Sequence, residues 1–257
     1  MGKVIAVANQ KGGVAKTTTT FNLGYELKEK GKRVLLIDYD PQGNLSLAAG
    51  INNEEVQGIT ELMQLEREDD PLPEREDVAI KYHGLDIIPS NLVLATEEIN
   101  LVNATCREYI LKAVIDEYKD EYDYVLIDCG PTLGMLLINA LTAADSVLIP
   151  VEPTDFSIKG LSLLLESVAR TIRKLNKKLK VEGIIFTKVD TRTNVWASSI
   201  KDVKEAYGAL NIFETKIPLR VAAEKANKRN VPIREFNKKD DSGVAYERLA
   251  MEVMQNE

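Results

Sequence analysis

The chain has 257 residues, of which 44% are hydrophobic and 28% are charged, and its formal net charge is −7. This composition indicates a globular protein with a large core, and we expect one domain over residues 1–257. It excludes a membrane-spanning protein, which needs roughly 20 consecutive apolar residues, and two cysteines exclude a disulfide scaffold. With no leader-like segment before Lys3, a cytoplasmic location is predicted.

The charge is unevenly distributed along the chain. Residues 1–160 contain 14 basic and 27 acidic residues, whereas residues 161–257 contain 19 and 13. The basic excess lies in the C-terminal part, and we interpret it as densest from Arg220 to Lys239. These residues form either a solvated face or a surface that binds nucleic acid.

The first predicted elements are a strand over Lys3–Ala8 and a helix over Thr17–Lys30, joined by a loop with two glycines. The loop and helix start read Lys11-Gly12-Gly13-Val14-Ala15-Lys16-Thr17-Thr18. Backbone N–H groups of such a turn converge on an anion, and the helix N-terminus adds positive potential. The pattern predicts a phosphate-binding loop, in which Lys16 neutralises the outer phosphates and the Thr17 hydroxyl is a ligand for Mg²⁺.

This loop departs from the common pattern G-x-x-x-x-G-K-[ST], because Gln10 and Ala15 occupy its two glycine positions. A second lysine, Lys11, precedes the glycine pair. The resulting K-G-G-x-x-K-[ST] resembles the deviant Walker A loop of the ParA/MinD family of ATPases. The resemblance implies that residues 11–18 bind ATP, and that Lys11 reaches the phosphates of the partner subunit in a nucleotide-sandwich dimer. That family pattern leaves position 15 open. The alternative is a glycine turn without a ligand.

A buried parallel strand is predicted over Arg33–Asp38, and it delivers Asp38 and Asp40 at its carboxyl end, where open α/β sheets bind ligands. Two carboxylates beside a triphosphate imply an intervening cation or water. The sequence D-Y-D-P-Q-G-N resembles the family segment D-x-D-P-Q-G-N. By that resemblance Asp40 orients the attacking water and Asp38 supports the magnesium shell. The alternative is an Asp-Pro turn with capping carboxylates.

The next stretch is predicted as an interrupted helix over Leu45–Leu65, a solvated charged loop over residues 66–77, and a short strand and turn over Leu85–Asn91. Apolar residues then recur at helical spacing over Thr96–Tyr118, which predicts one helix. Cys106 lies on that apolar stripe, so we expect it in the core.

The strand predicted over Tyr124–Asp128 ends in a candidate Walker B carboxylate, and Asp128 would bind Mg²⁺ through a water. The segment D-C-G-P-T-L-G resembles the family's switch II, D-x-P-P-S-L-G. Here Gly130 replaces the first proline, which leaves its N–H free to address the outer phosphate. The alternative is a buried strand with an ordinary acidic end.

Further strands are predicted over Ser146–Val151, Gly183–Lys188 and Glu214–Ile217, and helices over Ser157–Leu175 and Ala245–Asn256. The basic residues at the end of the first of these helices are explained by its dipole. The C-terminal helix lacks the basic, aromatic-rich character of a membrane anchor.

Two segments resemble regions of partition ATPases that contact DNA and nucleotide. In D-x-R-T-N at residues 190–194, the resemblance implies a contact between Arg192 and the DNA backbone, and the alternative is a salt bridge of Arg192 that fixes the loop. Pro218 opens a loop that lies near the adenine in the family. The family arginines after it are replaced by Leu219 and Ala222. Basic residues nevertheless crowd the region, and the predicted phosphate contacts are Arg220, Lys225, Lys228 and Arg229.

Together the alternating strands and helices predict an α/β fold with a doubly wound, mostly parallel sheet and helices on both faces. The sequence is most similar to the small, Soj-like ParA type. This implies slow, Mg²⁺-dependent ATP hydrolysis, an ATP-bound homodimer on nonspecific DNA, stimulation by a ParB-like protein and nucleoid association. The alternatives are a ParA-like ATPase that positions a non-DNA cargo, a MinD-like division regulator, and an iron–sulfur reductase, whose cluster motifs Cys129 does not fit.

Overall fold

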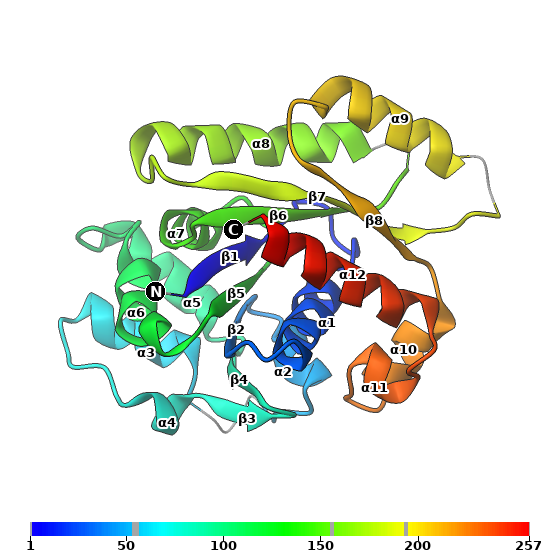
Figure 1. The fold of residues 1–257 in the computed structure, drawn as a ribbon. Coiled ribbons are helices and arrows are strands. Elements are labelled where there is room, and N and C mark those ends of the chain that lie inside the picture. Colours follow the sequence, from blue (N-terminus) through cyan, green and yellow to red (C-terminus); the bar gives the residue numbers. More distant parts are fainter. Residues whose placement is uncertain (1, 53–56, 155–156, 193–194, 257) are drawn as a thin grey trace.

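An eight-stranded sheet runs through the centre of the molecule, with helices on both of its faces (Figure 1). The computed structural model describes residues 2–52, 57–154, 157–192 and 195–256. The strand order is β3-β4-β2-β5-β1-β6-β7-β8, and β3 alone is antiparallel to its neighbour among these strands. This confirms the predicted mostly parallel α/β fold. The strands are β1 (Lys3–Val7), β2 (Val34–Tyr39), β3 (Ile80–Tyr82), β4 (Leu85–Ile88), β5 (Tyr124–Cys129), β6 (Ser146–Val151), β7 (Lys180–Val189) and β8 (Ile212–Pro218).

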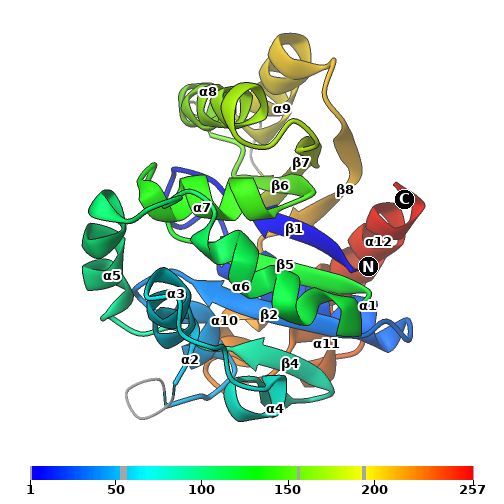
Figure 2. The same ribbon diagram turned by 90° about the vertical axis from the view of Figure 1, so that its left-hand side faces the viewer.

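Two hydrophobic cores form because successive residues of a strand point to opposite faces of the sheet. From β1, Val4 and Ala6 enter one core, and Ile5 and Val7 enter the other. The first core packs beneath α3 (Ile59–Arg67), α4 (Arg75–Val78), α5 (Leu94–Asn100), α6 (Ile110–Tyr118), α7 (Met135–Ala143), α8 (Ser157–Lys174) and α9 (Val195–Tyr207). The second packs beneath α1 (Lys16–Glu29), α2 (Asn44–Ala48), α10 (Val221–Asn227), α11 (Ile233–Phe236) and α12 (Asp241–Gln255) (Figure 2).

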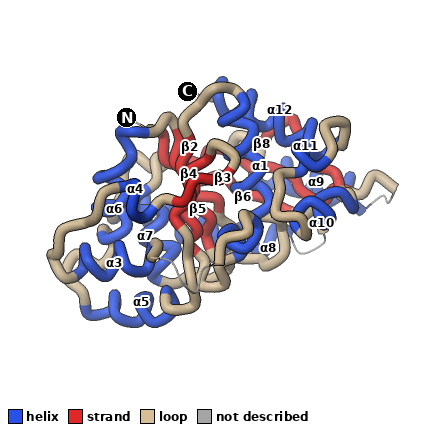
Figure 3. The backbone as a smooth tube through the Cα atoms, turned by 90° about the horizontal axis from the view of Figure 1, so that it is seen from below, coloured by secondary structure: helices blue, strands red, loops and turns tan. Residues whose placement is uncertain are grey.

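The carboxyl ends of β1, β2 and β5 come to one edge of the sheet because these strands are parallel and adjacent. Seen from below, the central strands lie between the two helical layers (Figure 3). The register pairs Asp38 of β2 with Asp128 of β5, and Val7 of β1 with the same Asp128. The two predicted acidic residues and the start of the glycine loop are therefore neighbours.

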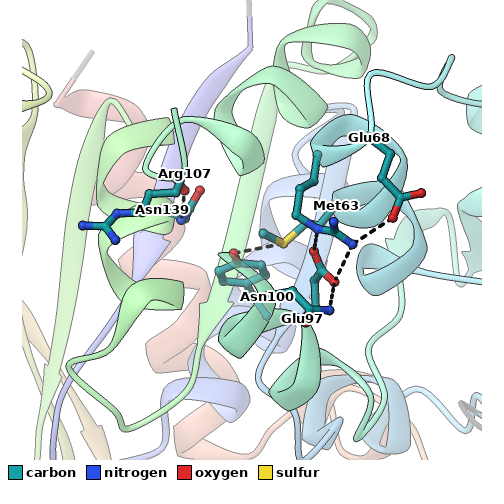
Figure 4. A network of polar contacts seen from close by, with 8 residues as sticks. Met63, Glu68, Glu97, Asn100, Arg107 and Asn139 are labelled. Atoms are coloured by element: carbon teal, nitrogen blue, oxygen red, sulfur yellow. Dashed lines mark hydrogen bonds and ion pairs between the residues drawn. The ribbon is translucent and has the colours of Figure 1, made fainter. Parts of the chain in front are cut away.

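A polar network fixes α5 and the end of β2 against α3 (Figure 4). The Arg67 Nε donates to Glu97 Oε1 at 2.6 Å, and the Asn100 amide donates to Glu97 Oε2 at 3.0 Å. The Tyr39 hydroxyl donates to Met63 Sδ at 3.1 Å. Because Tyr39 is fully buried immediately before Asp40, this contact helps to hold the turn that carries the carboxylate.

The helix predicted over Thr96–Tyr118 is wrong as a single element. The helix α5 ends at Asn100, a 3₁₀ turn η1 (Leu101–Asn103) follows, and α6 begins only at Ile110. Cys106 has a left-handed backbone (φ 49°) and is exposed, so its predicted core position is also wrong. The break is stabilised by Asn139, which accepts a hydrogen bond from the Leu111 N–H and donates to the Arg107 carbonyl. A side chain from α7 therefore sets the start of α6.

Other differences concern helices and turns that were not predicted as separate elements. The predicted loop over residues 66–77 contains the end of α3 and the start of α4, whose Arg75 pairs with Asp86 and Glu121. A second 3₁₀ turn, η2 (Lys119–Glu121), follows α6. The helices α7, α9, α10 and α11 were not predicted. None of the helices in the described part of the chain is long and apolar enough to cross a membrane.

Candidate functional site

The loop between β1 and α1 has the backbone that an anion-binding turn requires. Gly13 and Ala15 both have left-handed backbones, with φ of 76° and 66°. The Val14 carbonyl between them accepts a hydrogen bond of 2.9 Å from Thr187 Oγ1 of β7, which fixes the loop to the sheet. The N-cap residue of α1 is Ala15, whose methyl group cannot accept a hydrogen bond from the first turn. The N-terminal N–H groups of α1 are therefore available to a bound anion.

This loop borders a cleft of about 530 Å³ at the carboxyl edge of the sheet. The predicted residues in its lining are Gly12, Gly13, Ala15, Lys16, Thr17, Thr18 and Asp40. The unpredicted ones are Phe21, Gln42, Asn44, Leu47, Ala48, Pro131, Lys188 and Asn227. The cleft therefore joins the glycine loop to the start of α2 and the end of α10.

Asp128 adjoins Thr17 of the cleft lining and is held by two hydroxyl groups from the start of α1. Thr17 Oγ1 donates to Asp128 Oδ2 at 2.7 Å, and Thr20 Oγ1 is 3.2 Å from Asp128 Oδ1. The carboxylate is 1% exposed. Thr17 and Asp128 thus place two oxygen ligands of the kind that Mg²⁺ prefers side by side.

Asp38 and Asp40 have different surroundings although they are two residues apart. Asp38 is fully buried, and its Oδ2 accepts hydrogen bonds from the Ser46 N–H at 2.8 Å and the Ser46 hydroxyl at 2.7 Å. Asp40 lines the cleft, and its Oδ1 accepts from the Gln42 N–H at 3.0 Å. Asp38 therefore anchors the turn into α2, while Asp40 is the carboxylate that faces a ligand. A Cβ at Gly130 would lie 3.4 Å from the Asp40 carboxylate, so this glycine leaves room beside it.

The charges at the site are incompletely balanced. Burial and, next in size, the negative charge of Asp38 together raise the pKa of Asp128 to about 8. Burial also lowers the pKa of Lys16, against the opposing effect of Asp128. Both shifts mean that the charged form of the side chain is disfavoured, because a buried charge is stable only when groups of opposite charge lie close enough to balance it. A divalent cation and a polyphosphate would supply the missing charge of each sign.

The residues fit a magnesium ion that keeps much of its hydration. No group of three or more His, Cys, Asp or Glu side chains forms a metal cage within the described ranges. Mg²⁺ commonly needs only one or two protein ligands, with water and phosphate oxygens completing its octahedron. Thr17 and Asp128 match that donor set. Oδ2 of Asp38 is engaged with Ser46, which suits a role for Asp38 in supporting the ligand shell from outside.

Six predicted residues of the nucleotide and metal site are absent from the cleft lining, namely Lys11, Val14, Asp38, Asp128, Gly130 and Pro218. Lys11 and Pro218 have other surroundings. The Lys11 ammonium is 3.4 Å from Glu152 Oε2 and donates to Thr154 Oγ1 at 3.1 Å, both in its own chain. Pro218 lines a separate cleft with Thr191 and Trp196. The adjacent α10 contributes Asn227 to the main cleft instead.

The five predicted DNA-contacting residues form two groups. Arg192 and Arg220 are paired within the chain, with Asp190 at 2.7 Å and Asp241 at 2.8 Å respectively. Thr193 and Asn194, from the same D-x-R-T-N segment, lie outside the described residues. The second group is exposed on α10 and the turn after it, namely Lys225, Lys228 and Arg229.

Sequence reasoning missed Thr20, Ser46 and Lys188. Thr20 follows Thr17 by three residues, so helical spacing could have placed both hydroxyls near one partner. Lys188 has a left-handed backbone (φ 52°) near the carboxyl end of β7, where ligands of α/β sheets gather. Ser46 carried no signal, because its role depends on the turn that brings α2 back to β2.

Comparison with known proteins gives a consistent result. A family model described as an AAA domain matches residues 2–181. The chain is 42% identical over 261 residues to the sporulation initiation inhibitor protein Soj of Bacillus subtilis, covering all of both proteins. It is 38% identical over 256 residues to the chromosome-partitioning ATPase Soj of Treponema pallidum, covering 99% of this chain and 98% of that one. A crystal structure of cobyrinic acid a,c-diamide synthase from Mycobacterium smegmatis, with bound ATP analogue and magnesium, is 32% identical, with a TM-score of 0.84 over 98% of this chain and 93% of that one.

Proposed function

This chain belongs to the Soj/ParA family of ATPases, and from that premise we propose that it is a nucleotide-switched dimer that binds nonspecific DNA and acts in chromosome or plasmid partition with a ParB-like partner. It hydrolyses ATP to ADP and phosphate and uses Mg²⁺. The observation that carries the proposal is the left-handed loop that brings Lys16 and Thr17 to the cleft beside Asp128. We also propose that residues 1–257 act as one ATPase domain.

Each site residue has a separate task in this proposal. The N–H groups of residues 12–18 hold the phosphates, and the Lys16 ammonium neutralises charge that develops on the outer phosphate. Bound Mg²⁺ would add further neutralisation, held by Thr17 and Asp128. Asp40 accepts a hydrogen bond from the attacking water and orients it. Asp38 keeps the Asp40 turn in place through Ser46.

The switch depends on charge that only the triphosphate state provides. In our proposal Lys11 leaves Glu152 and reaches the phosphates bound by the partner subunit, so that ATP bridges two protomers. Hydrolysis removes the bridging charge and releases the dimer. We also propose that the Gly130 N–H, beside Asp40, addresses the outer phosphate, and that the loop opened by Pro218 lies near the adenine, although Pro218 itself lines a separate cleft.

For DNA, the exposed basic residues Lys225, Lys228 and Arg229 support phosphate contacts without base recognition. Arg192 and Arg220 are partly neutralised by their own aspartates. That pairing favours the second candidate function, a ParA-like ATPase that positions a non-DNA cargo. An electrophoretic shift of nonspecific DNA across a salt series, with and without ATP, decides between them. A shift that needs ATP supports partition, and no shift at low salt supports the other cargo.

Two variants test the ATP site itself. Lys16→Ala should abolish nucleotide binding, measured by titration calorimetry, and ATP-dependent dimers of this variant would refute the assignment. Asp40→Ala should bind ATP and dimerise but not turn over, and normal phosphate release would remove Asp40 from its role. Lys32→Ala, a lysine away from the cleft, is the control for both and should behave as the wild type.

A further inference from the structure

A dense group of positive charges lies where α8 ends and β7 begins. We call it the α8–β7 basic surface, and it consists of Arg170, Arg173, Lys174, Lys177, Lys178 and Lys180. Residues 170–180 include no acidic residue, and the rest of 161–257 contains 13 basic and 13 acidic residues. This segment therefore accounts for the whole basic excess of the C-terminal part. The prediction that the charge is densest from Arg220 to Lys239 is wrong, since that range holds seven basic and two acidic residues over a longer stretch.

All six side chains are exposed, and none forms an ion pair within the described residues. Arg170, Arg173 and Lys174 share one face of α8, because residues three and four apart are neighbours on a helix. The surface lies at the amino edge of the sheet, opposite the nucleotide cleft, as the end of α8 and the start of β7 show in Figure 1.

A cleft of about 710 Å³ adjoins this surface and is lined by Lys3, Lys177, Lys178 and Lys180. Its two acidic residues are already engaged. Glu182 pairs with Lys3 at 3.0 Å and accepts a hydrogen bond of 2.6 Å from the Ser146 hydroxyl, and Asp145 accepts one of 2.9 Å from the Val4 N–H. Within the described residues, neither carboxylate forms an ion pair with the lysines of residues 177–180.

The helix dipole explains only part of this arrangement. Arg173 and Lys174 lie in the last turn of α8, where positive charge is favourable, but the three lysines beyond it gain little, since the effect falls off within one turn. Six like charges in eleven residues also repel one another. A polyanion that follows the surface would remove this repulsion.

We propose that the α8–β7 basic surface is a second contact surface for the sugar-phosphate backbone of double-stranded DNA, separate from the one on α10. This rests on the proposed function, because it assumes that DNA is a partner. DNA is favoured over an anionic membrane because membrane-binding helices also insert apolar side chains. Among the described residues, no exposed large hydrophobic residue falls within 170–180. These contacts would involve only the charged phosphates, so binding should not depend on the nucleotide sequence of the DNA.

The test compares the triple variant Arg173→Ala, Lys177→Ala, Lys178→Ala with a control that removes three positive charges elsewhere, Arg33→Ala, Lys81→Ala, Lys112→Ala. Binding of a random-sequence duplex is measured by fluorescence anisotropy with ATP over a salt series. Loss of three phosphate contacts should lower the slope of log K against log salt by roughly 2–3 and weaken binding about 10- to 100-fold at moderate salt. The control should keep the wild-type slope, and ATP-dependent dimerisation should persist in all three proteins.

A triple variant with wild-type affinity and slope would overturn the inference while leaving the proposed function intact. A wild type that binds no DNA at any salt would instead overturn the proposed function, and this inference with it. If the triple variant does not fold, lysine acetylation of the wild type decides. DNA should protect Lys177, Lys178 and Lys180 several-fold, whereas protection by phosphatidylglycerol vesicles but not by DNA would overturn the inference.

Discussion

The backbone of the glycine loop predicts how substitutions at Gly12, Gly13 and Ala15 change the free energy of unfolding, and the change does not have the same sign at all three positions. Gly13 and Ala15 have left-handed backbones, whereas Gly12 does not, and a Cβ at Gly12 or Gly13 would meet no atom within 4 Å. An added Cβ would therefore clash with no neighbouring atom at either glycine. The two positions differ in backbone conformation, and a left-handed conformation is less favourable for an L-residue by about 1–2 kcal/mol.

The magnitudes follow from two opposing effects. Replacing glycine by alanine restricts the unfolded chain and stabilises the fold by about 0.4–1 kcal/mol where φ is compatible. Gly12→Ala should therefore be neutral or stabilising by up to that amount. Gly13→Ala adds the left-handed strain and should lower the free energy of unfolding by roughly 0.5–1 kcal/mol. Ala15→Gly is the reverse change and should raise it by a similar amount.

The assay is urea unfolding of the nucleotide-free protein, with the midpoint and the slope m determined for each variant. A constant m ensures that the change lies in stability rather than in the denatured state. Equal effects of Gly12→Ala and Gly13→Ala, or a destabilising Ala15→Gly, would refute the reasoning. Ala15→Gly should also keep ATP binding, because it removes a methyl group from the cleft and adds nothing to it.

Three further predictions concern other parts of the molecule. Burial raises the pKa of Glu26 to about 7 despite its ion pair with Arg234, so the folded protein binds this proton more tightly than the unfolded chain does. The free energy of unfolding should therefore fall as the pH rises from about 4.5 to 7. In Glu26→Gln this fall, measured by unfolding at pH 5 and pH 8, should be smaller by up to about 3 kcal/mol. Asn176→Ala removes the amide that donates to three carbonyls at the end of α7. The loss should reduce the free energy of unfolding by about 1–3 kcal/mol, seen as a lower melting temperature. Asn211→Ala removes an amide that donates to one carbonyl, and an equal or larger effect of that control would contradict the prediction. Glu152→Ala should change the ATP-dependent dimerisation constant by less than about fivefold in analytical ultracentrifugation, because the pair that it breaks is partly exposed.

The sequence allowed the central strands and the cleft to be predicted because their signals are local. A buried apolar run followed by a glycine turn or by Asp-x-Asp places the chemistry at a strand end without knowledge of the tertiary structure. Six of the eight predicted loop residues, together with Asp40, accordingly line one cleft. The charge pattern was less informative, since a count of lysines and arginines does not reveal that Arg192 and Arg220 are paired within the chain.

The errors arose where distant residues decide the local structure. The break before α6 depends on the Asn139 amide from α7, and helical periodicity alone predicted a continuous helix there. The helix α7 itself has apolar residues on every side, so it showed no amphipathic pattern that would distinguish it from a strand. The role of Asp38 in supporting the magnesium shell stays a prediction, and its hydrogen bonds from Ser46, eight residues later, had no signal in the sequence.

The position of Lys11 bears on how such a switch is controlled. Its ammonium lies between Glu152 and Thr154 of the same chain, so joining a partner's phosphates requires breaking these contacts. The two side chains of the ion pair are 36% and 30% exposed, and such pairs are typically worth 0–1 kcal/mol. Breaking an ion pair of that strength would change a dimerisation constant only about fivefold, which is far less than the change needed to move a protein from mostly monomer to mostly dimer. In the proposed function, control therefore lies with the nucleotide, whose outer phosphate would supply the charge that Lys11, Lys16 and a magnesium ion together neutralise.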